Sequence, residues 1–248
     1  TNSAIFMSSR RTRLKSANLV AMLAFAFLLT IPFRSAYASP GAHVVTAYGN
    51  AQIDTGQSKF GGASGLFDGT GDYLSLADSD DWNFGTGSFT IDFWVRFNVI
   101  PAVGVTQVVY TQYQDWNNRL HVFYQNSGGT LRWVFEGVQG GGNILWHQGI
   151  TSLSTGVWYH IALVRSENTF YWFRDGVQLA TTASSVTLPD YAGPVYVGQL
   201  GVSACYLNGW LDEFRVSKGV ARWTSNFSPP TSAHVADLST VLLLHMDG

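Results

Sequence analysis

The chain has 248 residues, of which 12% are charged and 15% are aromatic, and it contains 26 glycines. A low charged fraction with many aromatics and glycines is typical of all-β proteins, because aromatic side chains fit pleated, half-buried surfaces and glycines fit turns. The formal net charge of −2 argues against nucleic acid as a partner, and the single Cys205 excludes an internal disulfide.

The N-terminal residues have the pattern of an export signal. A basic stretch precedes an apolar run at residues 19–31, and residues 36–38 read Ala-Tyr-Ala, a small-residue cleavage pattern. We therefore expect a helical signal peptide over residues 1–38 and a mature chain with no stable membrane span. An uncleaved anchor is the alternative, but the apolar run is shorter than the about 20 residues of a membrane span. The route is Sec or twin-arginine, since the Arg-Arg pair at 10–11 fits the latter and Arg13 departs from it.

The rest of the chain alternates in hydrophobicity with the period of β-strands. The clearest run is residues 89–97, where the odd-numbered positions predict a core face and Thr90, Asp92, Trp94 and Arg96 predict a half-exposed face. The Asp175-Gly176 pair between two such runs predicts a type I′ hairpin turn. Strands are predicted at residues 89–97, 105–112, 119–125, 131–136, 158–165, 170–174, 177–180, 195–198, 210–216 and 241–245. Many short strands with frequent turns indicate a sandwich or a barrel.

Several motifs, in order over residues 60–217, resemble a known family. They lie at residues 67–74, 88–95, 158–165, 171–177 and 208–216, and include Phe-Asp-Gly-Thr-Gly-Asp-Tyr-Leu and Asn-Gly-Trp-Leu-Asp-Glu-Phe-Arg-Val. Together they resemble the laminin-G-like, or concanavalin A-like, lectin domains of bacterial and phage proteins. The resemblance implies an all-β fold, a two-sheet antiparallel β-sandwich of the jelly-roll type, that binds carbohydrate or protein.

The domain is expected at residues 39–230, and residues 231–248 end in a further strand. The final Leu-Leu-Leu-His-Met-Asp-Gly resembles the opening strand of such a domain in tandem arrays. Two readings stay open. This strand fills a free position in the same sandwich, or it begins a further repeat of a longer protein.

No catalytic residues are predicted, and the chain is expected not to be an enzyme. Glycosidases need two carboxyl groups about 5 Å apart if they retain configuration. The three glutamates are far apart in sequence, and the adjacent Asp212 and Glu213 are expected to point to opposite faces of a strand. Motifs of zinc peptidases and of serine hydrolases are missing from the sequence.

Two kinds of binding site are predicted. The family resemblance implies a calcium ion at the rim of the sandwich, with Asp68, Asp72 and Asp212 as ligands. Glycan binding is expected at Trp116, Asn117 and Trp146, because indole rings stack on sugars and neighbouring polar groups bind hydroxyls. The alternative for the two tryptophans is burial in the core.

Three functions remain open. The first is a non-catalytic binding or adhesion module, secreted or on the cell surface, with glycans or cell-surface polymers as partners. The second is a structural repeat of a phage tail or surface array that contacts neighbouring repeats and binds no small ligand, which would make it a virion component. The third, a glycoside hydrolase of this fold, requires a carboxylate pair that the sequence does not show.

Overall fold

The computed structural model describes residues 43–202 and 204–248, and the predicted signal segment lies outside them. The described residues form two antiparallel β-sheets and one short 3-10 helix, η1 (Asp80–Trp82), which confirms the all-β prediction. No helix in this part of the chain is long and apolar enough to cross a membrane.

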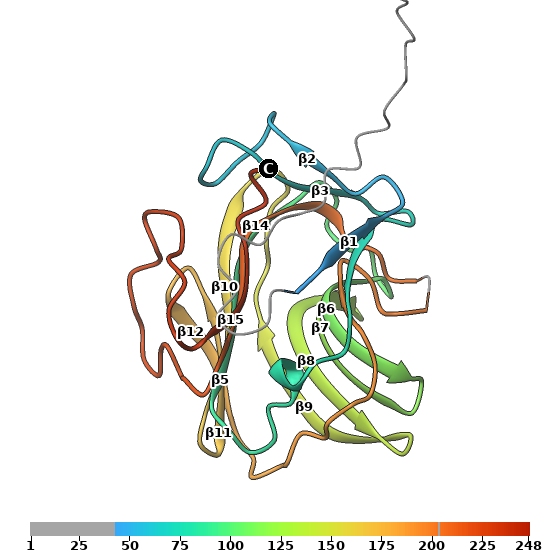
Figure 1. Cartoon of the computed structure of the whole chain (residues 1–248), viewed down its shortest axis with the longest axis vertical. Coiled ribbons are helices and arrows are strands. Elements are labelled where there is room, and N and C mark those ends of the chain that lie inside the picture. The colour runs from blue at the N-terminus through green and yellow to red at the C-terminus, as the bar shows by residue number, and fades with distance from the viewer. Residues whose placement is uncertain (1–42, 203) are drawn as a thin grey trace, which may run out of the picture. The chain divides into compact units, whose positions relative to one another are not determined.

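The first sheet has seven strands. Their order is β1 (Val45–Tyr48), β4 (Tyr73–Leu76), β13 (Val195–Val197), β6 (Thr106–Asp115), β7 (Asn118–Ser127), β8 (Thr130–Gln139) and β9 (Gly142–Ile150). Strands β6 to β9 are sequential neighbours joined by hairpins, and they form the larger part of this sheet in Figure 1.

The second sheet has eight strands. Its path is β12 (Val177–Ala183), β11 (Thr169–Arg174), β10 (Trp158–Ser166), β5 (Phe89–Phe97), β14 (Asn208–Lys218), β3 (Ser64–Asp68) and β2 (Gln52–Asp54), with β15 (Thr240–Leu244) pairing with β14 off this path. Strands β3 and β15 follow each other along one edge of β14, at residues 208–211 and 214–217. The C-terminal strand therefore pairs inside this sandwich.

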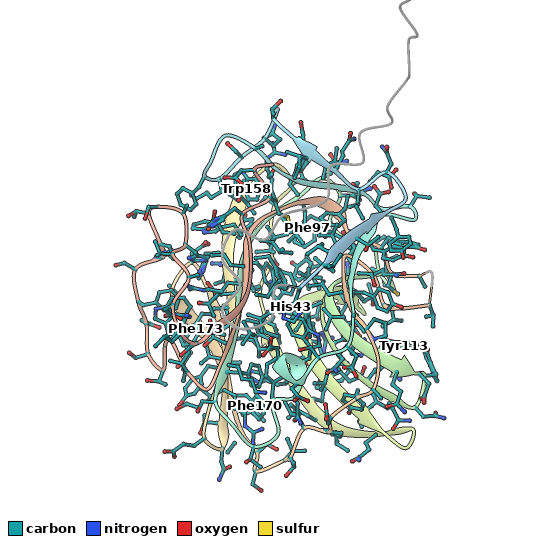
Figure 2. The ribbon with its side chains drawn as sticks, in the orientation of Figure 1. His43, Phe97, Tyr113, Trp158, Phe170 and Phe173 are labelled. Carbon is teal, nitrogen blue, oxygen red and sulfur yellow. The ribbon has the colours of Figure 1, made fainter. Side chains whose placement is uncertain are left out.

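The main core lies between the sheets. Alternation in β5 turns Phe89, Phe93 and Phe97 inward, as predicted, and all three are fully buried. Phe93 stacks on Phe214 of the same sheet, with ring centroids 5.8 Å apart. Figure 2 shows Phe97 and Phe170 between the two layers.

The opposite face of β5 is more buried than predicted. Thr90 and Asp92 have no exposed surface, because the segment after β14, residues 219–239, packs on this outer face. We call it the C-terminal segment; it contributes Trp223 and Phe227 to a small cluster around Phe173 of β11. Figure 1 shows it in orange and red beside β12.

The predicted hairpin turn between β11 and β12 is confirmed. Asp175 and Gly176 both have positive φ, 50° and 76°, as a type I′ turn requires. The turn also contacts the C-terminal segment, since the Phe227 N–H donates to the Gly176 carbonyl at 2.9 Å. A Cβ on Gly176 would stand 1.8 Å from the Phe227 carbonyl oxygen, so the position requires glycine.

The expectation that Asp212 and Glu213 point to opposite faces is wrong. The β5–β14 register shifts between Asp212 and Arg215, and Glu213 has a φ of 53°, which marks a β-bulge. Because of the bulge, Glu213 also reaches the outer face, where its Oε2 accepts from the backbone N–H of His234 in the C-terminal segment.

Candidate functional site

A row of side chains crosses the outer face of the seven-stranded sheet. Its members are cross-strand partners in successive strands, so they share one face, turned away from the core. From β9 to β13 they are Trp146, Glu136, His121, Thr111 and Tyr196. The residues next to them on each strand, among them Leu145, Phe135 and Leu120, lie in the core instead.

The centre of this row is a buried polar cluster. Nε2 of His121 and Oε2 of Glu136 share a hydrogen bond, and Nη2 of Arg119 lies 3.8 Å from the same carboxylate oxygen. Burial lowers the pKa of His121 more than Glu136 raises it. Burial also opposes ionisation of Glu136, but the hydrogen bond and charge of His121 and the charge of Arg119 keep the pKa of Glu136 below its usual value. Glu136 is therefore held as a carboxylate between His121 and Arg119.

Two exposed tryptophans flank the cluster. Trp116, in the β6–β7 hairpin, is 59% exposed, and the Arg119 guanidinium carbon lies 4.4 Å from its ring centroid. Trp146, opposite Glu136, is 40% exposed, and its Nε1–H donates to Oε1 of Gln148 at 3.2 Å. Neither ring is part of the core. Arg119 contacts Trp116, and Glu136 is the cross-strand partner of Trp146, so the Arg119–Glu136 pair lies between the two rings.

The predicted Asn117 is also exposed, in the same hairpin as Trp116. Its backbone N–H donates to Oδ1 of Asp115 at 2.7 Å, and its carbonyl accepts from the N–H of Gly141 at 3.0 Å. The hairpin is thus held to the β8–β9 turn, and this fixes the position of Trp116 at the edge of the face.

Several buried polar atoms of this face have no hydrogen-bond partner among the described residues. They are Oγ1 of Thr111, Nδ1 of His121 and Oε1 of Gln199, all in residues with at most 5% of their surface exposed. Buried polar groups are nearly always hydrogen-bonded. Because all three atoms are fully buried, they lie beneath the surface that a ligand would contact.

The far side of the same face carries a tyrosine cluster. Tyr48 stacks on Tyr73 with ring centroids 4.6 Å apart, and Tyr73 meets Tyr196 edge-on at 5.7 Å. Figure 2 shows Tyr113 on the outer side of this sheet, too. These tyrosines were not predicted as site residues; Tyr48 and Tyr73 lie on the short strands β1 and β4, which show little alternation.

The three predicted calcium ligands do not form one group. Asp72 accepts from the backbone N–H groups of Asn50 and Asp68, at 2.5 and 2.9 Å, so two of the three aspartates lie together. Asp68 is the cross-strand partner of Asn208 on β14. Asp212 lies four residues further along that strand, so the backbone positions of Asn208 and Asp212 are about 13 Å apart. Calcium binding at Asp68 and Asp72 stays a prediction.

The structure shows a cluster that the sequence analysis missed, beneath the C-terminal segment. The Asp92 carboxylate accepts hydrogen bonds from Nε and Nη2 of Arg215, both at 2.9 Å. Its Oδ2 also contacts two histidines: Nε2 of His160 lies 3.3 Å away and Nε2 of His234 lies 3.0 Å away. Asp92, His160 and His234 are the one group with metal-ligand spacing among the described residues. Arg215 already neutralises Asp92, so we interpret the cluster as a structural ion pair and not a metal site. The period-2 pattern had placed Asp92 on this face, but the partners come from distant segments.

Comparison with solved structures shows the same fold in several proteins. Domain 4 of an extracellular arabinanase from Geobacillus stearothermophilus, in complex with arabinotriose, has 16% identity and a TM-score of 0.56, over 73% of this chain and 84% of that one. The enzymatically active domain of tailspike protein 2 from bacteriophage CBA120 has 11% identity and a TM-score of 0.57, over 85% and 34%. The binding domain of Paraclostridial Mosquitocidal Protein 1 has 17% identity and a TM-score of 0.53, over 76% and 48%.

The chain thus spans less than half the length of the tailspike and toxin chains. None of the curated proteins matches the sequence. The model of the concanavalin A-like lectin/glucanases superfamily matches residues 68–224, which is more than half of the chain. The protein therefore belongs to the concanavalin A-like lectin/glucanases superfamily.

Proposed function

We propose that the protein is a non-catalytic carbohydrate-binding module, and that glycans bind on the outer face of the seven-stranded sheet. The observation that carries this proposal is the pair of exposed tryptophans, Trp116 and Trp146, on either side of a buried polar cluster. Indole faces stack against the CH faces of sugars, while fixed polar groups bind hydroxyls and set specificity.

The polar atoms of the site supply both kinds of hydrogen bond. A carboxylate such as Glu136 accepts hydrogen bonds, and a guanidinium such as Arg119 donates them. The Glu136 carboxylate is already hydrogen-bonded within the protein, which holds it in place before a sugar binds. A preformed site of this kind lowers the entropic cost of binding.

A glycoside hydrolase is the less favoured reading of the same face. Both stereochemical mechanisms need two carboxyl groups across the scissile bond. In the His121–Glu136–Arg119 cluster, Glu136 is the one carboxylate, and its neighbours are a histidine and an arginine. A carboxylate held below its usual pKa is also poorly suited to act as the general acid.

A glycan-binding role fits a secreted or surface location, because glycans are displayed there, and neighbouring repeats of a longer protein would be further partners. A structural repeat of a tail fibre or surface array, which would make the protein a virion component, is the alternative. The likeness to a tailspike domain supports it only at the level of the fold. A repeat unit without a ligand gives no reason for two exposed indoles on either side of a fixed polar cluster.

The test is a glycan array with the full chain, in calcium and again in chelator, with arabino-oligosaccharides included because domain 4 of the arabinanase was solved with arabinotriose. We expect hits that Trp146→Ala weakens about 10-fold or more, as for a buried aromatic contact at an interface. Leu238→Ala, which removes a fully exposed apolar side chain from the C-terminal segment on the other sheet, is the control and should leave these hits unchanged. An array without hits in either buffer would support the structural repeat.

A further inference from the structure

A second group of tryptophans lies on the opposite side of the sandwich, on the outer face of the eight-stranded sheet. Arg96 of β5 is the cross-strand partner of Trp158 on β10 and of Trp210 on β14. Its neighbours Val95 and Phe97 are fully buried in the core, so Arg96 and both indoles face outward. Figure 2 shows Trp158 at the upper end of this sheet.

Arg96 is a cation without a carboxylate partner in the described part of the chain. Its guanidinium carbon lies 4.8 Å from the ring centroid of Trp210. Trp210 is itself fixed, because its Nε1–H donates to Oδ2 of Asp54 at 2.7 Å. None of the Arg96 N–H groups donates to another described residue, so the planar edge that binds carboxylates and sulfates is free.

Lys59 places a second cation beside the first. Its ammonium nitrogen lies 3.9 Å from the ring centroid of Trp94, and it makes no ion pair with any described carboxylate. The backbone N–H of Lys59 donates to Oδ2 of Asp212 at 2.7 Å, which fixes the loop over the sheet. Trp94 and Arg96 are two residues apart on β5, with Cα atoms about 7 Å apart and side chains on the same face, so both cations lie on this face.

We propose that Lys59, Arg96, Trp158 and Trp210 form a second binding site, which takes the acidic sugars of a glycan, with a carboxylate or sulfate at Arg96 and Lys59 and the sugar ring against the half-buried indoles of Trp158 and Trp210. We call it the basic–aromatic site. It rests on the proposed function only in taking a glycan as ligand. Nucleic acid is disfavoured, because proteins that bind it neutralise many phosphates, whereas this site has two cations on a chain of net charge −2.

The test uses two matched pairs of probes. Oligogalacturonate is compared with its methyl ester, and dextran sulfate with dextran, by calorimetric titration of the full chain. We expect each charged probe to bind at least 10-fold more tightly than its neutral counterpart, and the difference between the two pairs identifies carboxylate or sulfate as the preferred anion. Equal affinity for charged and neutral forms would overturn the proposal.

The variants assign the binding to this face. Arg96→Gln and Lys59→Gln should each weaken binding of the charged probe about 10-fold, while Arg96→Lys keeps the charge, loses the planar edge and gives an intermediate loss. Lys218→Gln, at the other end of β14, removes one charge elsewhere and should change affinity less than 2-fold. Thermal unfolding of each variant identifies any that fail to fold.

The outcome is independent of the first site. Trp146→Ala should leave binding of the acidic probe intact, even if the chain binds no neutral glycan at all. If Trp146→Ala abolishes binding of the acidic probe and Arg96→Gln does not, the ligand occupies the first face and the proposal is wrong. It is also wrong if a single-stranded oligonucleotide binds more tightly than either acidic glycan.

Discussion

The variant Asp92→Asn tests how the C-terminal segment is held on the eight-stranded sheet. The Asp92 carboxylate is fully buried and accepts both hydrogen bonds of the Arg215 guanidinium at 2.9 Å. Asparagine keeps the shape of the side chain but leaves Arg215 buried without a counter-charge. Loss of one partner of a buried ion pair costs about 3–5 kcal/mol, so we expect the free energy of unfolding in urea to fall by that amount.

A matched control separates burial from charge. Asp237→Asn breaks the Arg222–Asp237 pair, whose carboxylate is half exposed, and should cost less than about 1 kcal/mol. The double variant Asp92→Asn/Arg215→Met removes the uncompensated charge and should be more stable than Asp92→Asn alone. A loss below about 1 kcal/mol for Asp92→Asn would refute this account of the segment.

The same cluster predicts the response to acid. Burial opposes ionisation of Asp92, but the hydrogen bonds with His160 and His234 and the charge of Arg215 hold its pKa well below 3.8. Because the folded pKa is the lower one, its contribution is complete above about pH 4 and is lost as the pH falls further. Asp92→Asn should therefore flatten the stability profile below about pH 4.

The remaining predictions concern a turn, a buried histidine and calcium. Gly176→Ala should destabilise the fold by more than about 1 kcal/mol in urea, because its Cβ would overlap the Phe227 carbonyl at a positive φ; an unchanged value would contradict the close contact. Burial lowers the pKa of His147 from 6.5 to about 4. Because the unfolded chain binds the proton first, the free energy of unfolding should fall by about 3 kcal/mol as the pH drops from 6.5 to 4, at 1.36 kcal/mol per pKa unit. A His147→Gln variant with the same dependence of unfolding free energy on pH would refute this. Calcium bound at Asp68 and Asp72 should raise the melting temperature, a gain that Asp68→Asn or a chelator removes; no change on adding calcium would exclude the ion.

Alternation predicted most of the large strands, because one face of each is packed in the core. Residues 89–97 correspond to β5 without any shift, and the Asp175-Gly176 turn has the backbone that its residue types require. Strand β9 was not predicted, because Gly140-Gly141-Gly142 has the pattern of a loop although Gly142 begins the strand. Strands β1, β2, β3 and β4 were not predicted either, because they have five residues or fewer and show little alternation.

The sites were less predictable than the fold, because they combine residues that are distant in sequence. Trp116 and Trp146 were singled out by their polar neighbours, but the sequence could not show that Arg119 and Glu136 connect them. The face around Asp92 was expected to be half exposed, since no local pattern reveals that residues 219–239 will cover it. The bulge at Glu213 was missed for the same reason: it depends on pairing with β5 and β15.

The central claim is that sugars bind on the outer face of the seven-stranded sheet at Trp146. The most direct measurement is a calorimetric titration of wild type, Trp146→Ala and Leu238→Ala with the strongest neutral oligosaccharide from the array. We expect a Kd about 10-fold or more higher for Trp146→Ala and an unchanged Kd for Leu238→Ala, whose side chain is exposed on the other sheet. Equal affinity of Trp146→Ala and wild type, or the same loss in both variants, would contradict the claim.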